Sequence, residues 1–303
     1  MNNMTIEEKI NKKKIGKIEK NVSLSKYTTY KAGGKAKLIV YPKNIDKLVE
    51  LLKLLKEDNV GYKILGNGSN LIFSDEPYKD VLIKLSELNE CEINDTIVKV
   101  GAGHSLISLA MKVSKLGLTG MEFATGIPGT VGGAVYMNAG AYKSDMGYIV
   151  SEVTLLSPNL EIITMYNKDL NFKYRSSFLQ KNKGYICLGA KIILKHGDKK
   201  AIKELIEDRR QKRLMTQPLE FPSAGSVFRN PENDYAWRLI DVCGLKGYSI
   251  GGAEVSRKHA NFIINKGNAT GKDIHDLIIF VQKKVKEETG VNLKIEQEFV
   301  NWE

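Results

Sequence analysis

The sequence GNGSN (residues 66–70) ends an apolar segment, and GIPGTVGGAVYMNAGAY (residues 126–142) again combines glycines with short polar side chains. In the first stretch, two glycines permit positive φ angles and a close approach of the backbone to a ligand. Successive N–H groups in such a turn form a concavity that binds anions. The candidate residues for holding a phosphate group are Gly66, Asn67, Gly68, Ser69 and Asn70.

The second stretch predicts a helix that begins after a glycine-rich turn. The N-terminus of a helix favours negative charge, so it suits a diphosphate, and the expected contacts are Gly129, Thr130, Gly132 and Gly133. A tight turn between strands would explain GNGSN alone about as well, but the two loops together predict a dinucleotide. Neither loop has the G-x-G-x-x-G pattern or the G-x-x-x-x-G-K-[ST] pattern, so a different fold would hold the cofactor.

Around these loops, hydrophobic periodicity predicts alternating strands and helices. The first loop lies in a β-α-β-β unit, with strands at 36–41 and 60–65 and a helix at 46–57. A second unit has a helix that starts at Leu106 and ends at Gly117, and strands at 96–103, 149–156, 161–165 and 185–194.

The C-terminal part begins with a basic helix at about 198–213, and the three prolines of QPLEFPSAGSVFRNP (217–231) exclude regular structure after it. Four elements follow: a short helix at 237–241, a strand at 261–265, a helix from Ile274 to Val285 that Gly290 caps, and a strand at 293–300. The expected organisation is α+β, with a basic leader (1–20) and three further parts (21–85, 86–197 and 198–303).

Composition favours a globular protein of several domains, because 42% of its 303 residues are hydrophobic and 27% are charged. No apolar run approaches the roughly 18–20 residues that span a membrane. The N-terminus lacks a signal-peptide pattern, so we expect a cytoplasmic protein without a membrane partner. The three scattered cysteines, Cys91, Cys187 and Cys243, predict reduced thiols. The histidines lack metal-ligand spacing, so no metal site is expected.

The net charge of +11 would suit a nucleic-acid partner. Lysines crowd residues 9–20, however, and no basic stripe with interleaved aromatic residues occurs. We therefore expect a solvated lysine-rich surface and no nucleic-acid partner. Its positive potential would attract substrates that carry phosphates and carboxylates.

Eight ordered segments resemble the UDP-N-acetylenolpyruvoylglucosamine reductase family, from about residue 22 to the last residue. They are YTTYKAGGKA (27–36), ILGNGSNLIFSD (64–75), GIPGTVGGAVYMNAGAY (126–142), YRSS (174–177), PSAGSVFRNP (222–231), LIDVCGLKG (239–247), GGAEVSRKHANFIIN (251–265) and IEQEF (295–299).

This resemblance implies a vanillyl-alcohol-oxidase-type (PCMH-type) FAD-binding domain of two α+β subdomains, followed by a C-terminal α+β substrate-binding domain. It implies FAD held without a covalent link, which agrees with the lack of histidine and cysteine in GNGSN. NADPH would be the co-substrate, and a UDP-sugar, UDP-N-acetylglucosamine enolpyruvate, would be reduced to UDP-N-acetylmuramate for peptidoglycan. The length suits the shorter subclass (type II), without a substrate-clamping tyrosine loop, and we expect a monomer or weak oligomer.

The resemblance also assigns three catalytic residues. Arg175 in YRSS would hold the substrate carboxylate with a planar charged fork. Ser226 in AGSVF would donate a proton, and Glu296 in the last strand would share the stabilisation of charge. Without the resemblance, these residues would be a surface arginine, a turn serine and an outward strand residue.

Asn230 in FRNP matches a family residue that contacts the substrate, and the looser substrate-binding candidates are Arg213, Gln217, Lys258 and His259. Taken alone, His259 is more often a structural histidine than a ligand. Two other functions stay open: an oxidase of the same superfamily that acts on a small alcohol, and a noncatalytic nucleotide-binding module.

Overall fold

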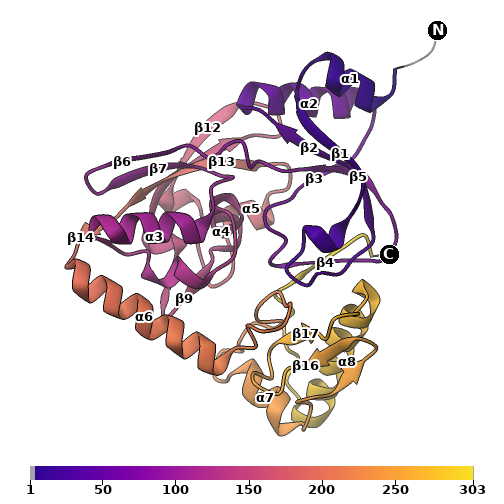
Figure 1. Ribbon diagram of the computed structural model, residues 1–303, viewed down its shortest axis with the longest axis vertical. Coiled ribbons are helices and arrows are strands. Elements are labelled where there is room, and N and C mark those ends of the chain that lie inside the picture. The colour runs from indigo at the N-terminus through magenta and orange to yellow at the C-terminus, as the bar shows by residue number, and fades with distance from the viewer. Residues whose placement is uncertain (1–3, 303) are drawn as a thin grey trace. The chain divides into compact units, whose positions relative to one another are not determined.

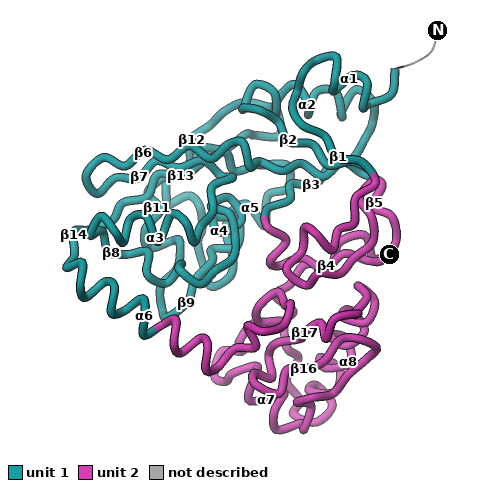
Figure 2. Tube along the Cα trace, viewed as in Figure 1, with its two compact units in different colours: residues 1–20, 38–66, 80–208 teal, residues 21–37, 67–79, 209–303 magenta. Residues whose placement is uncertain are grey.

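The computed structural model describes residues 4–302, which form two compact units (Figure 2). Unit 1 contains the described residues up to 20 together with 38–66 and 80–208. Unit 2 contains 21–37, 67–79 and the described residues from 209 onward. One boundary falls between Gly66 and Asn67, inside the first glycine-rich loop. The predicted parts with boundaries at residues 20, 85 and 197 stay a prediction.

The first sheet lies mainly in unit 1 and has four strands in the order β1-β2-β5-β3. They are β1 (Gly16–Ser23), β2 (Lys35–Pro42), β5 (Tyr78–Ile83) and β3 (Tyr62–Ile64), and β3 pairs in parallel with β5. Helix α2 (Ile45–Glu57) begins at Asn44, whose side chain accepts from the Lys47 N–H group, and it buries one leucine-rich face. The predicted strand at 36–41 and helix at 46–57 are confirmed.

The N-terminal segment, expected as a basic leader, forms helix α1 (Ile6–Lys12) and the start of β1. Ile10 and Ile15 are fully buried in the core of unit 1. Lys9 forms an ion pair with Asp58 at 2.5 Å, and Lys13 forms one with Glu50 at 3.0 Å. Acidic groups of unit 1 therefore neutralise part of the charge of this segment.

The second sheet of unit 1 has five antiparallel strands in the order β12-β11-β13-β7-β6. The strands are β6 (Cys91–Asn94), β7 (Ile97–Gly101), β11 (Val150–Leu156), β12 (Ile162–Tyr166) and β13 (Ile186–Ile193). Leu156 pairs with Ile162, which confirms the predicted hairpin. The short strands β8 (Leu118–Thr119) and β14 (Lys195–His196) pair with each other, as do β9 (Gly140–Ala141) and β10 (Ser144–Asp145).

Helices cover the second sheet of unit 1. Helix α3 (Leu106–Leu116) buries its predicted apolar face and ends at Gly117, whose φ of +82° is left-handed. Helix α4 (Val131–Met137) packs against β13 and β7 (Figure 1), and α5 is Phe178–Lys181. The predicted C-cap at Gly117 is thereby confirmed.

Unit 2 contains the C-terminal elements and two inserted segments. Helix α6 (Lys199–Thr216) crosses the unit boundary, and α7 (Ala236–Val242) and α8 (Gly271–Thr289) follow it. The strands are β15 (Ser249–Ile250), β16 (Ala253–Val255), β17 (Ile263–Asn265), β4 (Leu71–Phe73) and β18 (Glu298–Val300). Gly290 caps α8, as predicted, and the expected apolar face of α8 is buried. Across residues 4–302, no helix combines the length and apolarity that crossing a bilayer requires.

The expected final strand at 293–300 is shorter in the structure. Only Glu298–Val300 forms a strand, and it pairs in parallel with β4. Ile295 instead forms an isolated antiparallel bridge with Phe228. The segment changes its partner between residues 295 and 298, which interrupts a regular ladder.

Candidate active site

The first glycine-rich loop is a tight turn that packs on residues 27–29. Gly68 has a φ of +61°, and a Cβ added there would lie 2.1 Å from the carbonyl oxygen of Tyr27. The Thr29 N–H group donates to the carbonyl oxygen of Gly68 at 3.2 Å. Glycine at 68 is therefore required by close packing within unit 2 as well as by the turn.

Gly66 brings the two predicted phosphate loops together within unit 1. A Cβ added to Gly66 would lie 3.1 Å from Oγ1 of Thr130. The Lys84 ammonium donates to the carbonyl oxygen of Gly66 at 2.6 Å, and burial lowers the pKa of this ammonium. The loop thus has a neighbouring hydroxyl and a positive charge that would favour a phosphate.

The N-terminus of α4 differs from the expected anion site, because its N–H groups have partners within the protein. The Val131 N–H group donates to the main-chain carbonyl oxygen of His104 at 2.9 Å, and the Gly132 N–H group donates to that of Ala102 at 2.8 Å. Thr130 is the N-cap, and its hydroxyl accepts from the Gly133 N–H group at 3.2 Å. The N–H groups of Gly132 and Gly133 are thus already used. Contacts of Gly129, Thr130, Gly132 and Gly133 with FAD stay a prediction.

The chemistry of the two loops fits a bound dinucleotide. Both contain several glycines and short uncharged polar residues, and Asn67 and Gly133 are exposed. In the GNGSN loop, small residues leave main-chain atoms accessible to a ligand, whereas the N–H groups of Val131, Gly132 and Gly133 already have partners within the protein. The Lys84 cation at Gly66 adds a positive charge. This donor set suits the diphosphate of FAD held without a covalent bond.

In unit 2, the segments that carry Ser226 and Glu296 lie side by side. The Glu296 N–H group donates to the carbonyl oxygen of Val227, the residue after Ser226, at 2.8 Å. Ser226 and Glu296 are both half-buried. Gly225 has a φ of +74°, and a Cβ added there would meet no heavy atom within 4 Å. Two of the three predicted catalytic residues are thus brought together beside open space.

Asn261, which the sequence did not single out, fixes the Ser226 segment from its other side. Its carbonyl oxygen accepts from the Val227 N–H group at 2.9 Å. Its side chain accepts from the N–H group of Phe228 at 2.9 Å and donates to the carbonyl oxygen of Phe228 at 2.8 Å. The only available signal was its place in GGAEVSRKHANFIIN.

Arg175 lies in unit 1, at the tip of a turn closed by two hydrogen bonds of 3.0 Å between Lys173 and Ser176. Its φ is +52°, a left-handed conformation that costs a non-glycine residue about 1–3 kcal/mol. The buried Asn138 donates to the Lys173 carbonyl oxygen at 2.9 Å. The guanidinium carbon of Arg175 lies 5.2 Å from the ring centroid of Tyr174. The surrounding contacts hold Arg175 in a conformation that it would otherwise disfavour.

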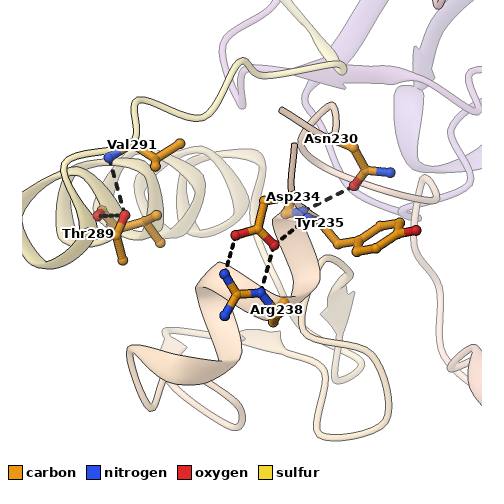
Figure 3. Close-up of polar contacts among 8 residues, drawn as sticks. Asn230, Asp234, Tyr235, Arg238, Thr289 and Val291 are labelled. Atoms are coloured by element: carbon orange, nitrogen blue, oxygen red, sulfur yellow. Dashed lines mark hydrogen bonds and ion pairs between the residues drawn. The ribbon is translucent and has the colours of Figure 1, made fainter. Parts of the chain in front are cut away.

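Asn230 lies in the loop that precedes α7. Its side-chain oxygen accepts from the Ala236 N–H group at 3.1 Å (Figure 3). In the same turn, Asp234 forms a two-point ion pair with Arg238 and accepts from the Tyr235 N–H group at 2.7 Å. Asn230 therefore stabilises the start of α7, and its predicted contact with substrate stays a prediction.

The remaining substrate candidates lie around the end of α6 and after β16. The Lys258 ammonium donates to the carbonyl oxygen of Leu214 at 2.7 Å. Arg213 occupies the last turn of α6, and the side-chain oxygen of Gln217 is buried without a hydrogen-bond partner in residues 4–302. Burial lowers the pKa of His259, which favours the neutral form of its ring. Lys258 thus ties its loop to α6, and the substrate contacts of all four residues stay predictions.

Two family models match the chain. Residues 36–166 match an FAD binding domain, and residues 217–300 match the C-terminal domain of UDP-N-acetylenolpyruvoylglucosamine reductase. The protein of that name from Anoxybacillus flavithermus is 45% identical over 296 residues, which cover 97% of this chain and 98% of that protein. The one from Bacillus subtilis is 41% identical over 294 residues, which cover 97% of each chain.

This chain belongs to the UDP-N-acetylenolpyruvoylglucosamine reductase family. The crystal structure of the Thermus caldophilus reductase has 34% sequence identity and a TM-score of 0.81, and covers 93% of this chain and 98% of that one. The family resemblance and the FAD-binding α+β fold predicted from the sequence are confirmed. Berberine bridge enzyme from Eschscholzia californica, at 17% identity and a TM-score of 0.50 over 64% of this chain and 44% of that one, shares the fold alone.

Residues 4–302 contain no group of three or more His, Cys, Asp or Glu side chains placed to bind a metal ion. The residues discussed above instead supply cations, hydroxyls and main-chain groups. This set suits an organic cofactor and an anionic substrate.

Proposed function

We propose that this reductase-family chain uses FAD and NADPH to reduce UDP-N-acetylglucosamine enolpyruvate to UDP-N-acetylmuramate in peptidoglycan precursor synthesis. The observation that carries the proposal is a family match over 97% of the chain. Bound FAD would take a hydride from NADPH and supply it to the vinyl carbon of the enol ether. The residues of the chain must then bind the substrate, stabilise charge and provide a proton.

Ser226 is the proposed proton donor. Hydride addition to the vinyl carbon leaves the electron pair of the former double bond on the adjacent carbon and its carboxylate. The Ser226 O–H bond breaks, a C–H bond forms at that adjacent carbon, and solvent returns a proton to the serine oxygen. A serine hydroxyl is a weak acid, so nearby cationic or hydrogen-bonding groups must favour the alkoxide.

Arg175 and Glu296 are proposed to stabilise the negative charge that develops on the substrate carboxylate. A guanidinium presents two parallel N–H donors to a carboxylate, which stabilises negative charge as it develops there. Glu296 would act as a neutral acid or through a bound water, from the segment that lies beside Ser226. Asn230, Arg213, Gln217, Lys258 and His259 are the proposed contacts for the rest of the substrate, in a substrate-binding domain at 198–303.

The proposed setting follows from the substrates. Nucleotide sugars and NADPH are highly charged and occur in the cytoplasm, so we place the enzyme there. We expect it to act as a monomer or weak oligomer, without a nucleic-acid or membrane partner. Its net charge of +11 would favour the approach of both anionic substrates.

The test separates the two half-reactions of Ser226→Ala under anaerobic conditions. The purified variant should be yellow and should accept electrons from NADPH at the wild-type rate. Oxidation of its reduced flavin by the UDP-enolpyruvyl sugar should be slower by about a hundredfold or more. Ser223→Ala, in the same segment, is the matched control and should behave as wild type. If Ser226→Ala keeps the second half-reaction, Ser226 is not the donor.

A further inference from the structure

Gln297 is a buried amide that binds the main chain of the Ser226 turn. Its side chain donates to the carbonyl oxygen of Ala224 at 3.1 Å, with longer contacts of 3.4 Å to those of Gly225 and Ser226. Its side-chain oxygen accepts from the Tyr30 hydroxyl at 2.9 Å. Gln297 is 4% exposed and Tyr30 is 1% exposed, so water cannot replace these bonds.

Tyr30 is itself held firmly. Its carbonyl oxygen accepts from the buried Asn265 side chain at 2.8 Å. The oxygen of that side chain accepts from the N–H groups of Gly267 at 2.8 Å and Ala269 at 3.0 Å. Burial raises the pKa of Tyr30, so its hydroxyl remains a donor to Gln297. A chain of buried hydrogen bonds therefore leads from the loop after β17 to the Ser226 turn.

Gln297 also follows Glu296 directly. The Glu296 N–H group donates to the main-chain carbonyl oxygen of Val227, and the Glu298 N–H group donates to that of Asn70 at 2.9 Å. The main chain of this short segment therefore contacts both the Ser226 segment and the GNGSN loop. Beside it, Gly225 has no side chain to pack, and a Cβ there would meet open space. The Gln297 amide is thus one restraint on the orientation of the Gly225–Ser226 peptide, beside the main-chain bridge between Ser226 and Phe262.

We propose that Gln297, oriented by Tyr30, is a positioning residue that sets where the Ser226 hydroxyl points relative to Glu296. The inference rests on the proposed role of Ser226 as proton donor. An amide accepts from Tyr30 and donates to the carbonyl groups at the same time. An apolar side chain does neither, and a carboxylate lacks the donor.

The test compares Gln297→Glu, Gln297→Met and Tyr30→Phe in the FAD-loaded enzyme. Each should be reduced by NADPH at the wild-type rate. Oxidation of the reduced flavin by the UDP-enolpyruvyl sugar should slow by about tenfold to a hundredfold in Gln297→Met and Tyr30→Phe, and in Gln297→Glu only at high pH, because small displacements of a reacting group are costly. Gln282→Met is the matched control, since Gln282 is a half-buried amide that donates to Leu293 in the same unit. It should keep both rates even if it lowers the Tm.

Gln297→Glu offers a conservative rescue. The neutral acid keeps one donor and one acceptor, whereas its carboxylate would face the carbonyl groups, so burial raises its pKa. The groups near it that titrate are Tyr30 and the flanking Glu296 and Glu298. The ratio of its second half-reaction rate to that of wild type should fall about tenfold as the pH rises from about 6 to about 9.

The outcomes separate the two proposals. If Ser226→Ala keeps the second half-reaction, the role of Ser226 fails whatever Gln297 does. If Ser226→Ala loses it while the Gln297 variants and Tyr30→Phe keep wild-type rates, the positioning role of Gln297 is overturned. Should the Gln297 variants not fold, Tyr30→Phe decides by the same criterion, because it removes one hydroxyl and retains the ring.

Discussion

The side-chain amide of Asn70 donates a hydrogen bond of 3.2 Å to the main-chain carbonyl oxygen of Glu296. The Glu298 N–H group donates to the carbonyl oxygen of Asn70 at 2.9 Å, just where β4 and β18 begin to pair. The end of the GNGSN loop and the candidate catalytic glutamate are thus joined within unit 2. A change in one segment should affect the position of the other.

Asn70→Ala removes the donor to Glu296 but keeps the main-chain bond. A lost hydrogen bond costs about 1 kcal/mol, so we expect FAD to bind about fivefold more weakly. Titration of the apoprotein with FAD, followed by flavin fluorescence, measures the change. Asn292→Ala, an exposed change in the same unit, is the control. Wild-type FAD affinity in Asn70→Ala would show that this bond does not order the loop.

Arg175→Lys keeps a positive charge but removes the planar pair of donors. We expect substrate-driven oxidation of the flavin to slow by about thirtyfold, since two-point recognition of a carboxylate is worth about 2 kcal/mol over a single contact. Reduction by NADPH should not change. Lys173→Ala, in the same turn, is the control, and stopped-flow absorbance follows both steps. Equal losses in both variants would point to damage of the turn rather than to a role of the guanidinium.

Gly68→Ala and Gly225→Ala form a matched pair, because both glycines have positive φ angles. At Gly225 the new Cβ meets open space, so only the backbone conformation costs free energy, about 1 kcal/mol. At Gly68 the Cβ would also collide with the Tyr27 carbonyl oxygen, so the free energy of unfolding should fall by about 3 kcal/mol or more. Urea unfolding measures both. Similar losses would contradict the packing at Gly68.

Cys187 should be inert at neutral pH. Burial raises the pKa of its thiol to about 12. Because the unfolded thiol ionises first, the free energy of unfolding should fall by about 1.4 kcal/mol per pH unit as the pH rises from 9.0 towards about 12. Below that window this thiol contributes no pH dependence. Urea unfolding at several pH values measures this dependence. The fall in the free energy of unfolding above pH 9.0 should be smaller in Cys187→Ala and unchanged in Cys91→Ala.

Local patterns in the sequence predicted the elements well where neighbours along the chain decide the structure. The leucines of α2 and the apolar face of α8 follow helical periodicity, and Gly117 and Gly290 end their helices in left-handed conformations. The hydrogen bonds and packing involved join residues a few positions apart, so they can be read from the sequence. The ordered segments, taken together, also predicted the family.

Tertiary packing decided what each site residue does locally. The first N–H groups of α4 are taken by residues 102 and 104, Asn230 accepts from the Ala236 N–H group at the start of α7, and Lys258 binds the end of α6. Gln297 meets Tyr30 across 267 positions of sequence. A buried polar group must find a partner, and which partner it finds depends on how distant segments pack. The sequence by itself therefore determined the family and most of the elements, whereas only the tertiary structure decided the extent of the final strand and the contacts that hold Ser226 and Glu296 together.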